Sequence, residues 1–370
     1  MPTSLITIIR KICLLSTHQK CSFARKFMYK HFIRPFLFLL NPEAIHKLVV
    51  STLKVAFALP GVKKLVCLAF SHNASTLKRT VFGIEFKNPI GLAAGFDKNA
   101  DLYPYLDAFG FSFIEVGTIT PKGQPGNPKP RSFRLAKDKA LINRMGFNNK
   151  GVGNALNNLK QRNSKVIIGG NIGKNTLTLN DKAHEDYLEC FKTLYNYVDY
   201  FVVNVSCPNI KDLKALQDTD NLERILSVLT KYRSAQNRYV PILLKVSPDL
   251  TKEMLNANIE TAISYKLDGF VATNTTTSRD NLLTSKQAIN SIGNGGLSGA
   301  PLKDKSTEII RHIYTKTNGS MPIIGVGGIY TVEDAIEKLN AGAALIQVYT
   351  GFIYEGPGIV KRIAKGIAKK

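Results

Sequence analysis

From residue 81 onward, short apolar runs alternate with amphipathic stretches, and this alternation limits the possible folds more than any other feature of the chain. Each run is rich in Val, Ile or Phe and lacks strict polar–apolar alternation, as expected for a parallel strand buried on both faces. Eight such runs in about 290 residues predict an α/β fold, a (β/α)8 TIM barrel, which typically takes about 250 residues. The runs are Ile90–Ala94, Phe113–Gly117, Val166–Asn171, Phe201–Val205, Ile242–Val246, Gly269–Thr273, Ile323–Gly327 and Ala344–Tyr349.

A doubly wound sheet is the alternative fold, but no G-x-G-x-x-G sequence follows the first run. Helical spacing between the runs predicts helices over Asp220–Tyr232, Lys252–Tyr265 and Thr331–Ala341. The segment Thr80–Phe86, just before the first run, is expected to form a small hairpin that closes the bottom of the barrel.

The charge of the chain is uneven. The full sequence of 370 residues carries 50 Lys+Arg and 27 Asp+Glu, a net charge of +23, yet residues 1–80 contain a single acid, Glu43. A basic segment on a more balanced body indicates an anionic surface as its partner, either membrane or nucleic acid. We therefore divide the chain into an N-terminal extension (1–27), a helical segment (28–80) and the barrel (81–370).

More than one interpretation fits each of the first two parts, residues 1–27 and 28–80. Residues 1–27 are basic, apolar and free of acids, which fits either an amphipathic targeting segment or an extension upstream of a start near Met28. In 28–80, the spacing of Ala44–Leu59 predicts a helix that starts at Asn41 and stops at Pro60. This segment is either a helical cap on the barrel or, as its apolar faces and scarce acids favour, a membrane-surface module. No run approaches the 20 apolar residues of a spanning helix.

Cysteine and histidine usage excludes several kinds of site. The five cysteines are odd in number and form no C-x-x-C pair, so neither a disulfide framework nor structural zinc is expected. Beyond residue 80 only His184 and His312 occur, both inside expected helices. A histidine base and a bound metal are therefore not expected in the barrel.

The ends of the expected strands carry amides, hydroxyls, lysine and glycine, and in a TIM barrel these ends form the active site. Amides donate and accept hydrogen bonds, so they suit a flat polar heterocycle. Glycines after the last two runs allow backbone N–H groups to approach a phosphate, and Lys245 places a cation near an electron-rich ring. The residues predict a phosphate-bearing cofactor and a small heterocycle. The amides that carry this argument are Asn143, Asn171, Asn204, Asn209 and Asn274.

Cys207 follows the fourth run, between Ser206 and Pro208. Most cysteines are small core residues, but this one is expected at the mouth of the site. Because no histidine is available there, its thiol, with an ordinary pKa of about 8.5, is the best proton acceptor.

These motifs, in this order, resemble dihydroorotate dehydrogenase from about Met28 to the C-terminus. The most specific segments are Gly91–Lys98, Ile142–Asn149, Asn204–Asn209 and Gly296–Gly299. The resemblance implies an FMN-containing TIM barrel, a flavin-dependent oxidoreductase acting on CH–CH groups. It would oxidise (S)-dihydroorotate to orotate in de novo pyrimidine (UMP) biosynthesis.

The resemblance also implies roles for individual residues. Cys207 stands at the position of the catalytic base. The implied FMN contacts are Ala93, Ala94, Gly95, Phe96, Asp97, Thr118, Asn171, Asn204, Lys245, Thr273, Gly299, Gly328, Tyr349 and Thr350. The implied substrate contacts are Lys98, Asn143, Arg144, Met145, Gly146, Phe147, Asn204, Asn209, Asn274 and Thr275.

The helical segment and the loop 213–217 resemble class 2 enzymes, which associate with a membrane and reduce quinone. In that pattern His46, Arg134 and Tyr349 lie near the quinone path. One departure is Cys207, because class 2 enzymes usually have Ser there and the soluble class 1 enzymes Cys. We expect a peripheral protein on the cytoplasmic side of the inner (cell) membrane, with the mitochondrial inner membrane as the alternative.

Two other functions are compatible with parts of the sequence. A tRNA dihydrouridine synthase-like enzyme would also use FMN and a cysteine, and its basic charge would bind RNA phosphates. The second alternative is an inactive, membrane-associated ligand-binding barrel. Since much of the excess charge lies in residues 1–80 and the strand-end motifs are intact, we expect no nucleic-acid partner and no obligate protein partner.

Overall fold

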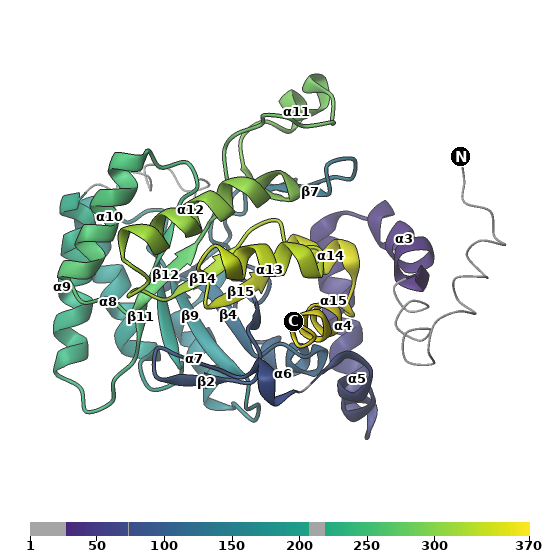
Figure 1. Ribbon diagram of the computed structural model, residues 1–370, viewed down its shortest axis with the longest axis horizontal. Helices are drawn as coiled ribbons and strands as arrows, with labels where there is room; N and C mark the ends of the chain where they lie inside the picture. The colour runs from purple at the N-terminus through teal and green to yellow at the C-terminus, as the bar shows by residue number, and fades with distance from the viewer. Residues whose placement is uncertain (1–26, 73, 207–218) are drawn as a thin grey trace.

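The computed structural model describes residues 27–72, 74–206 and 219–370, and it contains a closed parallel barrel at its centre (Figure 1). The barrel order is β10-β11-β12-β14-β15-β3-β4-β9. Every predicted run contributes one strand, so the predicted TIM barrel is confirmed. The strands are β3 (Ile90–Leu92), β4 (Phe113–Ile119), β9 (Ile167–Ile172), β10 (Tyr200–Asn204), β11 (Ile242–Val246), β12 (Gly269–Ala272), β14 (Ile323–Val326) and β15 (Leu345–Val348).

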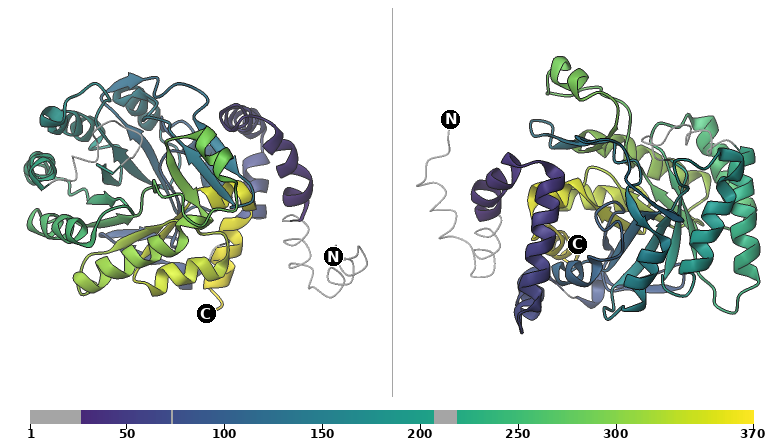
Figure 2. Two further views of the ribbon diagram at one scale, coloured as in Figure 1. Left: turned by 90° about the horizontal axis from the view of Figure 1, so that it is seen from above. Right: turned by 180° about the vertical axis from the view of Figure 1, so that it is seen from behind.

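Helices surround the barrel in the two views of Figure 2. The three helices predicted from spacing are present as α9, α10 and α13. Local signals explain their starts: the Thr251 side chain accepts the Met254 N–H at the start of α10, and Thr331 forms a capping box with Asp334 at α13. The helices of the barrel domain are α6 (Tyr103–Leu106), α7 (Val152–Lys160), α8 (Ala183–Leu194), α9 (Thr219–Ser234), α10 (Lys252–Ser264), α11 (Lys286–Ile292), α12 (Lys303–Lys316), α13 (Val332–Asn340), α14 (Thr350–Glu355) and α15 (Ile359–Ile367), with short helical turns at Asp107–Phe109, Asn180–Lys182 and Ala300–Leu302.

An apolar layer fills the lower half of the barrel. The hairpin of β1 (Arg79–Val81) and β2 (Ile84–Phe86) closes the bottom, as predicted, and inserts Val81 and Phe86 into this layer. Burial of such side chains stabilises the fold by about 25 cal/mol per Å² of apolar surface. The other members are Phe113, Tyr200, Val202, Leu243, Val271, Ile324 and Leu345.

Two small antiparallel sheets stand beyond the opposite end of the barrel strands. One, of order β13-β7-β6, joins segments about 150 residues apart, because Gly296 pairs with Asn143. Its neighbour α11 projects from the body in Figure 1. The strands of the two sheets are β5 (Lys122–Gln124), β6 (Ser132–Leu135), β7 (Ala140–Asn143), β8 (Asn149–Gly151) and β13 (Gly296–Gly299).

The helical segment lies against one side of the barrel (Figures 1 and 2). It is attached by apolar packing, for example of Phe57 against the barrel core, and by polar contacts. The Tyr29 hydroxyl donates to the Ile353 carbonyl at 2.7 Å, and Arg131 bonds Glu43 at 2.9 Å. Asn41 caps α4, so the expected helix is present. The elements are η1 (Tyr29–Ile33), α3 (Arg34–Leu39), α4 (Pro42–Ala58), α5 (Val62–Phe70) and η2 (Ser75–Leu77).

Large apolar side chains of this segment face outward. The exposed fractions reach 76% for Phe36 and 81% for Leu39. Within the described residues, no single helix has the length and hydropathy of a membrane span, whereas the pair Tyr29–Leu39 and Pro42–Ala58, bent by 118°, passes that test jointly. The other exposed apolar residues of the segment are Met28, Phe32, Ile33, Leu40, Leu48, Val49, Val55, Leu59, Leu65 and Leu68.

Candidate functional site

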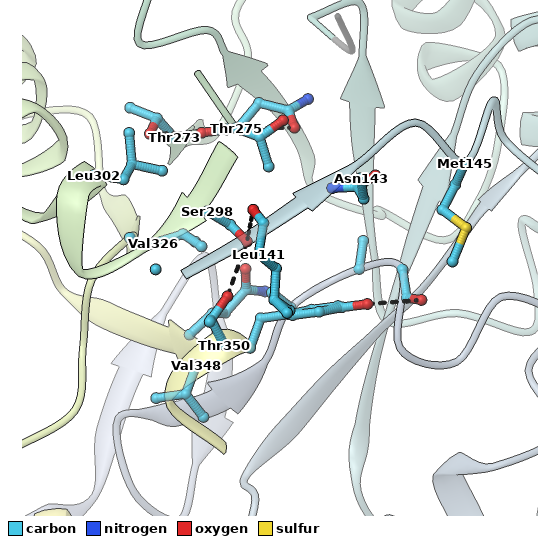
Figure 3. Close-up of a pocket in the computed structure, with 18 of the residues that line it drawn as sticks. Leu141, Asn143, Met145, Thr273, Thr275, Ser298, Leu302, Val326, Val348 and Thr350 are labelled. Carbon is cyan, nitrogen blue, oxygen red and sulfur yellow. Dashed lines mark hydrogen bonds between the residues drawn. The ribbon is translucent and has the colours of Figure 1, made fainter. Parts of the chain in front are cut away.

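A cavity opens at the carboxyl ends of the barrel strands, beneath the β13-β7-β6 sheet. Residues from the ends of the barrel strands and from that sheet line it together. Figure 3 shows Leu141 and Asn143 from β7 across the pocket from Val348 at the end of β15 and Thr350 at the start of α14. Strands that are far apart in the sequence thus supply opposite walls of one site.

The structure brings most of the expected site residues to this cavity. The expected FMN contacts that line it are Ala93, Ala94, Gly95, Thr118, Asn204, Lys245, Thr273, Gly299, Gly328, Tyr349 and Thr350. The expected substrate contacts that line it are Lys98, Asn143, Met145, Gly146, Phe147, Asn204, Asn274 and Thr275.

Other expected contacts lie away from the cavity wall. The carboxylate of Asp97 accepts the backbone N–H groups of Asp101, Leu102 and Tyr103 at 2.8–3.0 Å, so it orders the loop after β3. Burial, followed by the nearby Asp101, raises the pKa of Asp97 to about 6. Arg144 turns away and donates to the Ile292 and Pro130 carbonyls.

Two further expected residues, Phe96 and Asn171, support the wall from behind. Phe96 packs edge-on against Tyr349, with 5.7 Å between ring centroids. Asn171 accepts from Thr118 at 2.5 Å, and both of these residues accept a bond from the Asn204 amide. Cys207 and Asn209 lie outside the described residues.

The floor of the cavity is a buried polar layer above the apolar layer of the barrel. Glu115, in the middle of β4, accepts from Lys245 at 3.1 Å, from Asn171 at 2.7 Å and from Gln347 at 2.7 Å. Glu115 is fully buried, and Lys245 and Gln347 are 5% and 1% exposed. Each buried charge is thus paired and hydrogen-bonded, as burial requires.

Amides form the wall next to this floor. The Asn274 amide donates to Asn204 Oδ1 and Ser206 Oγ, both at 3.1 Å, and Asn274 Oδ1 accepts the Thr275 N–H. These bonds fix how each amide faces the cavity. Asn148 also lines the cavity, and its buried Oδ1 has no hydrogen-bond partner among the described residues.

Lys98 supplies a half-buried cation to the cavity. Burial lowers its pKa to about 8, opposed by Glu43 and reinforced by Arg131. A desolvated ammonium of this kind binds a small carboxylate strongly, because the charges attract with little screening.

Glycine-rich turns form the end of the cavity near β14, β15 and β13. Gly328 adopts a φ of +69°, and a Cβ there would lie 2.4 Å from Lys303 Cβ, so only glycine lets the turn pack against α12. The hydroxyls of Ser298 and Thr350 are 2.9 Å apart at this end (Figure 3). Backbone N–H groups and hydroxyls of this kind suit a phosphate.

A line of aromatic rings connects the helical segment with the cavity. The His46 and Phe96 ring centroids are 5.0 Å apart, and Phe96 in turn contacts Tyr349 at the wall. Burial, followed by Lys98, lowers the pKa of His46 to about 4, so the ring is neutral at pH 7. Arg134 donates to the Leu40 carbonyl at 2.6 Å and lies over the Phe38 ring at 4.5 Å.

Several residues of the site lie outside the strand-end motifs and were not predicted. Glu115 and Gln347 lie within strands and resemble core positions in the sequence. The charge of Glu115 inside an apolar run is the signal that could have indicated a site residue there. Ser132, Leu141 and Ser298 come from the upper sheet, which no sequence periodicity indicated. In residues 27–72, 74–206 and 219–370, no group of three or more His, Cys, Asp or Glu is placed to hold a metal.

Comparisons with known proteins agree with this geometry. A family model described as dihydroorotate dehydrogenase matches residues 76–370. The dihydroorotate dehydrogenase (quinone) of Christiangramia forsetii is 53% identical over 343 residues, covering 93% of this chain and 99% of the relative. That of Idiomarina loihiensis is 45% identical over 338 residues, covering 90% and 98%. The ligand-free DHODH structure from Eimeria tenella has a TM-score of 0.80 at 37% identity, covering 89% of this chain and 94% of that one.

Proposed function

The chain belongs to the dihydroorotate dehydrogenase family, and we propose that it oxidises (S)-dihydroorotate to orotate with FMN as cofactor and a membrane quinone as final acceptor. Its activity is that of dihydroorotate dehydrogenase (quinone), in pyrimidine biosynthesis. The family uses a flavin; that this flavin is FMN is part of the proposal. The family match over residues 76–370 favours this function over the tRNA-modifying and inactive-barrel alternatives.

The cavity residues fit FMN. Amide and hydroxyl groups from Thr118, Asn204 and Thr273 suit the polar edge of a flavin ring, and the glycine turns with Ser298 and Thr350 suit its phosphate. When bound, FMN supplies a two-electron hydride acceptor.

The same cavity also holds groups suited to the substrate. Lys98 would bind the carboxylate of dihydroorotate, and the amides of Asn143 and Asn274 would match the ring N–H and C=O groups. Because the Asn274 amide is already fixed by Asn204 and Ser206, the pyrimidine would be held in one orientation. Such fixed positioning contributes much of the rate in this kind of reaction.

Cys207 is our candidate for the base that removes the C5 proton as the hydride leaves C6. The neighbouring Ser206 is buried, and its hydroxyl accepts from Asn274 in the cavity wall. This contact brings the chain to the site immediately before Cys207, which supports the assignment. Base catalysis typically contributes about 10²–10⁴-fold.

The helical segment is our candidate for the membrane contact and the quinone entry. Its outward-facing apolar residues would enter the interface of a bilayer while basic residues meet anionic headgroups. The contacts from His46 through Phe96 to Tyr349 indicate where a quinone would approach the flavin. We place the protein peripherally on the cytoplasmic side of the inner membrane.

The observation that carries this proposal is the convergence of Lys98, Asn143, Asn204, Asn274 and Lys245 on one cavity. The test is anaerobic mixing of the purified protein with dihydroorotate, followed by a soluble quinone, while flavin absorbance is recorded. Bleaching and then recovery are expected. C207A should slow bleaching by at least about 100-fold while C207S retains part of the rate. A flavin that dihydroorotate does not bleach would refute the proposed function.

A further inference from the structure

Glu115 is a buried charged residue that has no role in the proposed mechanism. Glu115 is fully buried in β4, with its carboxylate directed into the barrel beneath the cavity. Burying a carboxylate is costly, and an apolar side chain would serve packing alone at lower cost. The charge at this position therefore calls for a functional explanation.

The contacts of Glu115 couple it to the cavity floor. Its two oxygens accept three bonds, and two of the donors, Lys245 and Gln347, line the cavity themselves. The third donor, Asn171, accepts from Thr118, another lining residue. Glu115 does not line the cavity, so any influence on a ligand passes through these neighbours.

The charges of the floor cancel in this arrangement. Lys245 and Glu115 form an ion pair with 3.1 Å between Nζ and Oε1, and both are almost completely buried. Beneath them lies the apolar layer that includes Phe113, Tyr200 and Leu243. In such a medium an unbalanced charge acts at longer range and with less salt screening than at the surface.

We propose that Glu115 is a positioning residue that sets the net charge of the cavity floor and thereby tunes how strongly the site favours reduced over oxidised flavin. This inference rests on the proposed function. A two-electron-reduced flavin carries more negative charge than the oxidised form, so a more positive floor favours reduction and a more negative floor opposes it. Glu115 offsets the cation of Lys245 and keeps the flavin easier to reoxidise.

The test compares midpoint potentials of the flavin in purified holoprotein for E115Q, K245Q and the double variant E115Q/K245Q. E115Q leaves the floor with an extra positive charge, so the ratio of affinities for reduced and oxidised flavin should rise by about tenfold. That ratio corresponds to a potential about 30 mV higher for two electrons. K245Q should shift the potential in the opposite direction, and the double variant should return near the wild-type value.

A matched control removes a carboxylate at the other end of the barrel. Asp199, just before β10, bonds Arg162 at 2.8 Å, and D199N removes the charge of an ion pair without touching the cavity. Its potential should not change. Thermal unfolding of every variant reports whether the fold is retained, and the step from K245Q to the double variant isolates Glu115 if E115Q alone is unstable.

A purely structural role would give a different pattern. In that case E115Q, K245Q and the double variant would all weaken flavin binding, the potentials would shift in one direction or not at all, and the double variant would not restore the wild-type value. That pattern would overturn the inference. If the protein holds no flavin and binds none when FMN is added, the proposed function fails first, and the two failures are thereby distinguished.

Discussion

We expect Lys98 to make the affinity for the product orotate depend on pH in a range where ordinary lysines do not titrate. Burial lowers its pKa to about 8, against 10.5 for an unperturbed lysine. Between pH 7 and pH 9 the charged fraction of such a group falls from about nine-tenths to about one-tenth. If the carboxylate of orotate binds the charged form, its Kd should rise about tenfold across this range, equivalent to about 1.4 kcal/mol.

The assay is orotate titration of the oxidised holoprotein, followed by flavin absorbance, at several pH values between 6.5 and 9. K98M should bind orotate weakly at every pH and lose the pH dependence. K150M is the matched control, because Lys150 is an exposed lysine outside the cavity wall, and it should retain the wild-type profile. A Kd that is flat from pH 7 to 9 in the wild type, or a slope that persists in K98M, would refute this role of Lys98.

Three further predictions concern the helical segment. E43Q removes the carboxylate that faces the 7%-exposed Arg131 and should lower the free energy of unfolding by about 2 kcal/mol. The control E85Q, in the exposed Lys78–Glu85 pair, should change it by less than about 0.5 kcal/mol. Equal losses in the two variants would contradict a stabilising role for the buried pair. The pKa of His46 is about 4 in the folded protein and 6.5 in the unfolded chain. The free energy of unfolding should therefore contain about 3 kcal/mol from the neutral ring that is present above pH 6.5 and lost as the pH falls to 4. Chemical denaturation should show a flatter pH profile of this free energy for H46Q. F36S/L39S should reduce sedimentation with anionic vesicles by at least about tenfold while dihydroorotate still bleaches the flavin, and L283S, at an equally exposed leucine near α11, should leave sedimentation unchanged.

The barrel could be predicted because its strands leave a strong local signal. A strand covered on both faces needs a continuous apolar run, and β11 was predicted with its observed bounds Ile242–Val246. The antiparallel sheet over the cavity was not predicted. Its pairing of β13 with β7 joins segments about 150 residues apart, and a contact of that kind has no local periodicity.

The candidate site could be predicted at the level of residue types and strand ends. The sequence does not show which way a side chain turns. Asp97 and Arg144 lie in the expected motifs, yet their polar groups bond the backbone of neighbouring loops and not the cavity. Glu115 is the opposite case. It lies in the middle of a strand and outside the expected motifs, yet the tilt and closure of the barrel place its carboxylate in the polar layer at the cavity floor.

We propose that dihydroorotate oxidation in this barrel delivers electrons to a membrane quinone. Steady-state oxidation of dihydroorotate by the holoprotein, with a quinone, fumarate and NAD offered separately, tests it most directly. We expect turnover with the quinone alone. Turnover that prefers fumarate or NAD would contradict it.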